Sequence, residues 1–264
     1  MKLSSPGKIL FEDAKITKQG VADYYKAVAK VMLPFIKGRA ISLVRCPDGV
    51  EAGCHYRKNK DGTVDEVITI SNLRELLNEV RMNTIEFHMY GYKINNPDSP
   101  DIMVFDLDPG EGTGFAKIRQ GARDVRGILQ ELGLACFLKT SGGAGFHIVV
   151  PFSRVSSYQV FSDFAHKIAL LMEAKWPTRY TTNIRKDARK GKIFVDWLRN
   201  SRGATSVAPY SLRARTGAAI SFPLSWEELD KYKPADITIN NVREFLKKKN
   251  PWEDFFKLGK RQRL

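Results

Sequence analysis

The sequence predicts an α/β (α+β) fold with a mixed sheet, and three observations support this prediction. Residues 20–36 place apolar side chains at helical spacing and are followed at once by the apolar run AISLVRC, as in a helix followed by a strand. From residue 102 onward, apolar runs of strand length alternate with helical patterns and glycine turns. No Ser-, Gly- or Pro-rich linker or repeat interrupts the chain. We therefore expect one domain, 1–264, with lobes at about 1–95 and 96–264.

Local signals place the individual elements in order. Ser71 is a plausible cap for the helix LRELLNEVRM, and Gly133 ends the helical pattern that begins near residue 115. Ser225 and Glu228 form the capping box of a short helix, and NNVREFLKKK supplies another. The remaining expected elements are the strands 102–108, 135–139, 146–152 and 192–198 and the helix 157–175. The order of these strands in the sheet does not follow from one sequence.

The net charge indicates a polyanionic partner. Lys and Arg total 43 against 29 Asp and Glu, which gives +14 at pH 7. Such an excess favours nucleic acid through long-range attraction and counterion release. The alternative is a basic protein whose charges only face water.

The three cysteines are too few and too scattered for a disulfide framework, and no Cys/His cluster has zinc spacing. The first residues, MKLSSPGKILFEDAK, lack the apolar stretch of a signal peptide, and no apolar run has the length of a membrane span. We expect a cytoplasmic, nucleoid-associated location rather than secretion or membrane insertion.

Two aspartates end the strand IMVFDLD. Because side chains alternate along a strand, Asp106 and Asp108 face the same way while Leu107 points into the core. Two such carboxylates repel each other unless a cation lies between them. Mg²⁺ or Mn²⁺ suits hard oxygen ligands and keeps positions open for substrate phosphates. The alternative is a turn or cap, favoured by Pro109-Gly110, in which one Asp accepts backbone hydrogen bonds.

A third carboxylate, Asp196, interrupts the apolar run KIFVDWL, where a lone buried charge would be costly. Three aspartates at neighbouring strand ends are able to hold two metal ions, the arrangement used in nucleotidyl transfer. The alternative is a salt bridge from Asp196 to one of the nearby arginines.

The stretch KTSGGAGFHIVVPF is suited to an anion. Its turn glycines, Gly142 and Gly143 among them, let backbone N–H groups approach a triphosphate, and Ser141, Lys139 and His147 add donors. A plain glycine hairpin is the alternative. The arginines downstream suit phosphates, although a solvated basic face is the default for such a run.

The motifs FDLDPGEG, KTSGG-x-G-x-H and VDWLRNSRGATSVAPYSLRAR together resemble the polymerase domain of bacterial DNA-repair ligase D and its stand-alone relatives in non-homologous end joining. These proteins belong to the archaeo-eukaryotic primase superfamily. The stretches ITKQGVADYYKAVAKVMLPFIKGRAISLVRCPDG, IEFHMYG and NPWEDFF are similar to the same family, so the resemblance covers nearly the whole chain.

The resemblance implies a primase-like fold, whose catalytic lobe (96–264) has an RRM-like core beside a DNA-binding lobe (1–95). It implies a template-directed nucleotidyltransferase, a DNA/RNA polymerase that extends primers and fills gaps at double-strand breaks with two Mn²⁺ or Mg²⁺ ions. Ribonucleotides are often preferred in the family, and a DNA ligase and the end-binding protein Ku are the implied partners. Primase activity on a bare template is a subsidiary possibility.

The resemblance also assigns residues. Asp106, Asp108 and Asp196 match the metal ligands, and His88 matches the active-site histidine. The other matches are Ser141, His147, Arg199 and Arg213 near the nucleotide, Lys8 and Lys18 at the downstream 5′-phosphate, and His55 and Tyr56 stacked on the template. The structural alternatives are ordinary surface lysines for Lys8 and Lys18, a core histidine for His88 and a packing aromatic for Tyr56.

Two departures from the family pattern bear on affinity. Ala144 stands where many relatives have Lys in the glycine turn, and His55 replaces an aromatic hydrocarbon ring. Two other functions compete with the polymerase. A phosphatase of the D-x-D-x-T type is disfavoured because residue 110 is Gly. An end-bridging module with secondary or absent catalysis would not need three metal-ligating aspartates.

Overall fold

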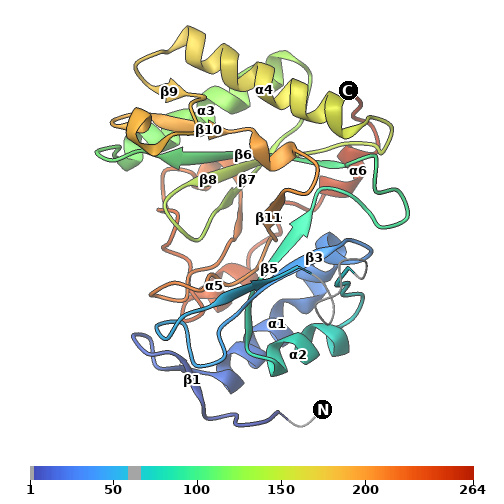
Figure 1. Cartoon of the computed structure of the whole chain (residues 1–264), viewed down its shortest axis with the longest axis vertical. Helices are drawn as coiled ribbons and strands as arrows, with labels where there is room; N and C mark the ends of the chain where they lie inside the picture. The colour runs from blue at the N-terminus through green and yellow to red at the C-terminus, as the bar shows by residue number, and fades with distance from the viewer. Residues whose placement is uncertain (1–2, 59–66) are drawn as a thin grey trace. The chain divides into compact units, whose positions relative to one another are not determined.

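The structure is a computed structural model that describes residues 3–58 and 67–264 (Figure 1). The chain forms two compact units. Unit 1 runs to Tyr90 and also contains Thr205–Phe222 and Ala235–Lys249. Unit 2 is built from Gly91–Ala204, Pro223–Pro234 and Asn250–Leu264. The sequence analysis predicted two lobes, each continuous in sequence. In the structure, two later segments belong to unit 1, and one of them carries Arg213.

Unit 1 contains a four-stranded sheet with strand order β11-β5-β3-β4, in which neighbouring strands are antiparallel. A short hairpin of β1 and β2 precedes it. The elements of this unit are β1 (Ile9–Phe11), β2 (Ile16–Thr17), α1 (Lys18–Ile36), β3 (Ile41–Arg45), β4 (His55–Arg57), α2 (Leu73–Arg81), β5 (Thr84–Tyr90), β11 (Thr205–Val207) and α5 (Val242–Leu246).

Helix α1 covers one face of this sheet. Its start is capped by Thr17, whose hydroxyl accepts a hydrogen bond from the Gly20 N–H at 3.1 Å. On its buried stripe, the ring of Tyr25 packs edge-on against Phe87 of β5, and its hydroxyl donates to the carbonyl of Ile85. Because side chains alternate along β5, the even-numbered residues of this strand point to the face of the sheet opposite α1.

The structure tests two helix caps that the sequence predicted. The cap expected at Ser71 is wrong by one residue, because the side chain of Asn72 accepts the hydrogen bond from the Glu75 N–H. The capping box of Ser225 and Glu228 is confirmed, although it begins a single 3₁₀ turn, η4 (Trp226–Glu228), in unit 2.

Unit 2 contains a six-stranded mixed sheet with strand order β12-β7-β8-β6-β10-β9. Only β10 and β9 run parallel among the described pairs. Its strands are β6 (Ile102–Pro109), β7 (Phe137–Thr140), β8 (Phe146–Pro151), β9 (Tyr180–Thr181), β10 (Ile193–Asp196) and β12 (Pro223–Leu224). Its helices are α3 (Phe115–Glu131), α4 (Tyr158–Lys175), α6 (Phe255–Gly259) and the 3₁₀ turns η2 (Lys186–Arg189) and η3 (Leu198–Asn200).

Helices α3 and α4 pack against each other and against the central strands of this sheet (Figure 1). Gly133 follows α3 with φ +72°, the left-handed conformation expected at the end of a helix. Strand β6 lies at the centre, bonded to β8 on one side and β10 on the other, so its acidic end has a neighbouring strand on each side. Within the described residues, no helix is both long and apolar enough to span a membrane.

Candidate functional site

The three aspartates meet at the end of β6. Asp106 and Asp108 share one face of that strand, and Asp196 of β10 lies directly opposite Asp106 in the antiparallel register. One ligand oxygen from each of the three lies within 4.8 Å of the others. Asp106 and Asp196 are buried and Asp108 is partly buried. The sequence prediction that these carboxylates converge is confirmed.

Cationic side chains surround Asp106 and Asp196. Arg199 places its Nε 3.4 Å from Asp106 Oδ2 and 3.1 Å from Asp196 Oδ2. On β8, His147 lies opposite Asp106 in the register, with its Nε2 3.3 Å from Asp106 Oδ1. The fully buried Lys139 follows on β7, opposite His147. The carboxylate of Asp106 therefore has four sequence-predicted residues around it: Asp196, His147, Lys139 and Arg199.

The carboxylates differ in proton affinity because their neighbours differ. Burial alone would raise the pKa of Asp106, but the His147, Arg199 and Lys139 charges hold it well below its usual range. Burial and the Asp106 and Asp196 charges raise the pKa of Asp108 to about 7. Burial also raises the pKa of Asp196, against the opposing effect of Arg199. The like-charge repulsion within the cluster thus has its largest effect on Asp108, where the Arg199 and Arg189 charges offset it only in part.

The cluster fits a divalent cation. Three oxygen donors converge, and burial together with the Asp106 and Asp196 charges raises the pKa of Asp108 more than the Arg199 and Arg189 charges lower it. Among the described residues, none donates a hydrogen bond to the Asp108 carboxylate, so the cap alternative does not hold there. The alternative for Asp196 holds in part, because it pairs with Arg199 and its Oδ1 accepts from the Leu198 N–H at 2.9 Å. Hard cations such as Mg²⁺ and Mn²⁺ match this donor set.

The glycine turn between β7 and β8 packs against the acidic strand. A Cβ atom at Gly145 would lie 2.1 Å from the carbonyl oxygen of Leu107, the residue between the two aspartates, so only glycine fits there. The Ser141 hydroxyl accepts hydrogen bonds from the N–H groups of Gly143 and Gly145 at 3.1 and 3.2 Å. Ser141 therefore shapes the turn, and Gly142 adopts φ +64°.

The basic run around β10 divides into two groups. Arg185 and Arg202 are exposed and pair with Asp187 and Asp98, as expected for a solvated face. Arg189, by contrast, stacks on the ring of Phe194 at 3.8 Å and lowers the pKa of both Asp108 and Asp196.

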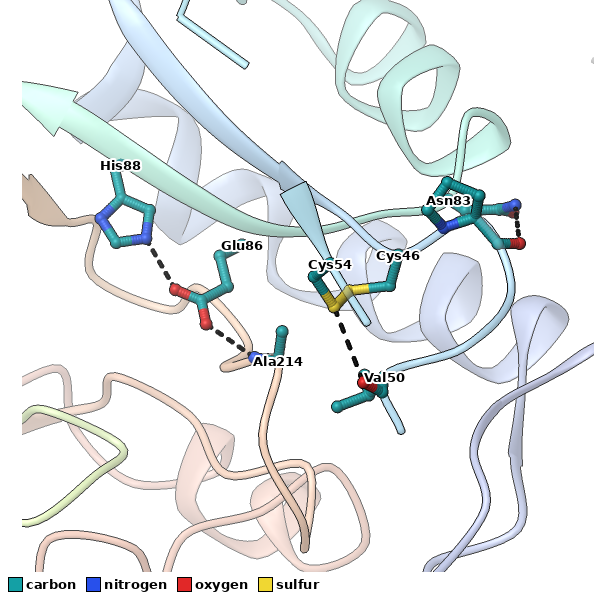
Figure 2. The surroundings of a disulfide bond; sticks show 8 residues. Cys46, Val50, Cys54, Asn83, Glu86, His88 and Ala214 are labelled. Carbon is teal, nitrogen blue, oxygen red and sulfur yellow. Dashed lines mark hydrogen bonds and ion pairs between the residues drawn. A yellow bond between two sulfur atoms is a disulfide. The ribbon is translucent and has the colours of Figure 1, made fainter. Parts of the chain in front are cut away.

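A second cluster lies in unit 1, on the face of β5 opposite α1. Glu86 Oε2 lies 2.6 Å from His88 Nε2 and 3.0 Å from Arg213 Nε, and Glu86 Oε1 accepts from the Ala214 N–H at 2.7 Å. Figure 2 shows the Glu86 carboxylate between His88 and Ala214. Burial would raise the pKa of Glu86, but these partners lower it to about 2. His88 and Arg213 thus contact the same carboxylate, an arrangement that the sequence analysis did not predict.

Lys8 and Lys18 also come together. The Lys18 N–H donates to the Lys8 carbonyl at 2.8 Å, and Lys18 Nζ donates to the Arg81 carbonyl at 2.7 Å. Burial, followed by the Lys8 and Arg81 charges, lowers the pKa of Lys18. Lys8 Nζ lies 3.1 Å from Asp48 Oδ1. Three cationic side chains gather here, which is the composition expected of an anion site.

His55 and Tyr56 lie on β4, where alternation directs them to opposite faces. Tyr56 is 61% exposed, and its ring centroid lies 5.5 Å from that of His88. Tyr56, rather than the pair, shares a face with the Glu86 cluster. Cys46 and Cys54, for which no disulfide was expected, are bonded across the loop that joins β3 to β4 (Figure 2).

Sequence reasoning missed Glu86, Arg81, Arg189 and the disulfide. The E-x-H spacing in IEFHMYG was the available signal for Glu86, because residues two apart on a strand share a face. The cysteines flank a Pro-Asp-Gly turn, which was the signal for the disulfide. Arg81 and Arg189 stand among many other basic residues, so charge alone did not single them out.

Comparisons with known proteins identify the family of this chain. The family model for the LigD primase-polymerase domain matches residues 17–252. The chain is 33% identical over 285 residues to the multifunctional non-homologous end joining protein LigD of Pseudomonas aeruginosa, covering 100% of this chain and 34% of that protein. The LigD protein of Mycolicibacterium smegmatis is 33% identical over 262 residues, with 92% of this chain and 34% of that protein covered.

A solved structure, the polymerase domain of Mycobacterium tuberculosis ligase D in complex with DNA, superposes with a TM-score of 0.89. It is 30% identical, and the match covers 97% of each chain. The chain spans about a third of the length of the curated relatives it matches. It belongs to the LigD primase-polymerase domain family, a family of DNA-directed nucleotidyltransferases.

Proposed function

We propose that this protein extends primers and fills gaps at DNA double-strand breaks by template-directed nucleotidyl transfer, with a preference for ribonucleotides, in non-homologous end joining. The converging aspartates carry the proposal: oxygens of Asp106, Asp108 and Asp196 lie within 4.8 Å of one another on adjacent strands. The names of the relatives and the net charge of +14 support a DNA substrate and the end-joining context.

Asp106, Asp108 and Asp196 would hold two Mn²⁺ or Mg²⁺ ions, one by all three carboxylates and one by Asp106 and Asp108. When bound, the ions would lower the pKa of the primer 3′-hydroxyl and neutralise charge on the leaving pyrophosphate. Asp108 must give up its proton to serve as a ligand, and its pKa near 7 makes this possible at neutral pH.

The nucleotide site would lie beside the aspartates. The backbone N–H groups of Gly142 and Gly143, together with His147 and Arg199, would orient the triphosphate. Lys139 is buried near Asp106 and would supply charge that Ala144 does not. Ser141 would keep the turn in the required shape through its hydrogen bonds to Gly143 and Gly145.

Unit 1 would bind DNA. Lys8 and Lys18 would hold the downstream 5′-phosphate, and Tyr56 would stack on the template, with His55 contributing less because it faces away. His88 would position the primer terminus or the reacting nucleotide, and Arg213 the phosphates. A DNA ligase and the end-binding protein Ku are the proposed partners, and the proposed location is the nucleoid region of the cytoplasm.

Gap filling on a synthetic duplex tests this function. We expect incorporation that follows the template base, that is faster on a gap with a 5′-phosphate than with a 5′-hydroxyl, and that favours ribonucleotides with Mn²⁺ or Mg²⁺.

Lys18→Ala should reduce DNA binding on the phosphorylated gap to the level of the hydroxylated gap at low salt. Lys30→Ala, an exposed lysine of α1, is the matched control. Tight end binding without any incorporation would instead favour the end-bridging module.

A further inference from the structure

Glu86 lies at the centre of the unit 1 cluster, although no sequence motif assigned it a role. The residue is 4% exposed, and its carboxylate receives three donors on two oxygens: His88 Nε2, Arg213 Nε and the Ala214 N–H. Two of the donors belong to residues of the proposed reaction site, and the third fixes the backbone next to Arg213. One buried carboxylate therefore contacts both side chains and the backbone next to one of them.

The donor count requires a carboxylate at this position. An ionised Glu accepts hydrogen bonds at both oxygens and donates none, so its three partners must all present protons. His88 therefore carries a proton on Nε2, and in the neutral imidazole Nδ1 is then the acceptor. A Gln in place of Glu86 would point its NH₂ group either at the Ala214 N–H, which would then lose its acceptor, or at His88 and Arg213, which would then both lose theirs.

The neighbouring strands hold Glu86 in place. In the sheet register Glu86 lies opposite Val44 of β3, which in turn lies opposite Tyr56 of β4, while His88 lies opposite Ser42. The Tyr56 and His88 rings are 5.5 Å apart at a tilt of 59°. The proposed template-stacking ring and the proposed reaction-site histidine thus share one sheet face with Glu86.

We propose that Glu86 is a positioning residue, which fixes the orientation and protonated nitrogen of His88 and the direction of Arg213 so that the two act as one unit. This proposal rests on the proposed nucleotidyl transfer for its kinetic consequence. The structural part of the proposal, that Glu86 controls the His88 ring, does not depend on catalysis and is measured separately by NMR.

NMR of the imidazole nitrogens tests that part in the full chain, with His88 assigned from its absence in His88→Asn. In the wild type at about pH 8, where an unperturbed imidazole is neutral, we expect the Nε2 of His88 to carry a proton. In Glu86→Leu, which offers His88 no acceptor in any orientation, we expect that proton to leave Nε2 or to be shared between both nitrogens. An unchanged His88 nitrogen spectrum in a folded Glu86→Leu protein would overturn the proposal.

Primer-extension kinetics test the consequence. Loss of an orienting partner typically costs about 10- to 100-fold in activity, and we expect a kcat reduction of this size in both Glu86→Gln and His88→Ala. If the two act as a unit, the double variant should be within about threefold of either single variant. Independent, multiplying losses would overturn the proposal.

Glu79→Gln is the matched control, because Glu79 forms a 2.7 Å ion pair with Arg45 in the same unit without contact to His88. It should leave kcat within about twofold of wild type and leave the His88 spectrum unchanged. If the wild-type protein transfers no nucleotide, the proposed function fails, while the spectra still decide whether Glu86 positions His88.

Discussion

Replacement of Asp108 by Asn should stabilise the metal-free protein while it removes metal binding. Asp108 faces Asp106 and Asp196 in a partly buried cluster, and its pKa is raised to about 7 from an ordinary 3.8. A shift of this size corresponds to about 4 kcal/mol, and the partial exposure of Asp108 reduces the expected effect to about 2–4 kcal/mol. Asn occupies the same space without charge.

The pH dependence of this effect has a definite sign. A carboxyl group with a raised pKa in the folded state binds protons more tightly there than in the unfolded chain, so its contribution to stability falls as pH rises. The gain from Asp108→Asn should be near zero at about pH 4, grow between about pH 4 and 7, and stay constant above that.

Urea denaturation in EDTA at several pH values measures this gain directly. Asp163→Asn, an exposed carboxylate on α4, is the matched control and should change stability by less than about 0.5 kcal/mol. With Mn²⁺ added, the wild type should gain stability and Asp108→Asn should not. A loss of stability in Asp108→Asn at about pH 8 in EDTA would refute the reasoning, because it would make Asp108 a structural cap.

Three further predictions follow from the packing. Gly145→Ala should abolish nucleotide incorporation and destabilise the protein, since its Cβ would lie 2.1 Å from the Leu107 carbonyl oxygen; Gly127→Ala on α3, with nothing within 4 Å, should be harmless by both thermal denaturation and activity. Glu86 has a folded pKa of about 2 against an ordinary 4.5, so it stabilises the fold above about pH 4.5 and loses this effect as pH falls toward 2. In acid titrations followed by circular dichroism, Glu86→Gln should therefore weaken the dependence of stability on pH between about 2 and 4.5. An unchanged pH dependence in this range would contradict the lowered pKa of Glu86. Cys54→Ser should lower the free energy of unfolding by about 2–3 kcal/mol under non-reducing conditions, from the loop entropy of the bond to Cys46, and by nothing once the wild type is reduced.

The acidic site was predictable from the sequence because local rules determine it. Strand alternation places Asp106 and Asp108 on one face, and the cost of a lone buried charge in IFVDWL points to a partner for Asp196. Which strands are neighbours was not predictable, since strand order depends on packing across the whole sheet. The register that sets Asp196 opposite Asp106, and His147 on the other side, came only from the structure.

The prediction was weakest where one residue depends on a distant segment. Arg213 follows the aspartate-bearing strands in the sequence but belongs to unit 1, where its Nε contacts Glu86. Ser141 was assigned to the triphosphate by its position, whereas its hydroxyl accepts hydrogen bonds within the turn. The cap at Asn72 instead of Ser71 reflects a different limit, because adjacent polar residues compete for one position.

Template-directed incorporation of a single nucleotide into a gapped duplex, compared between wild type, Asp106→Asn and Asp163→Asn, tests the central claim most directly. If the aspartate cluster is the catalytic centre, wild type and Asp163→Asn should incorporate the complementary nucleotide at equal rates with Mn²⁺. Asp106→Asn should then show no measurable incorporation, although it binds the same DNA. Incorporation by Asp106→Asn at the wild-type rate would contradict the account.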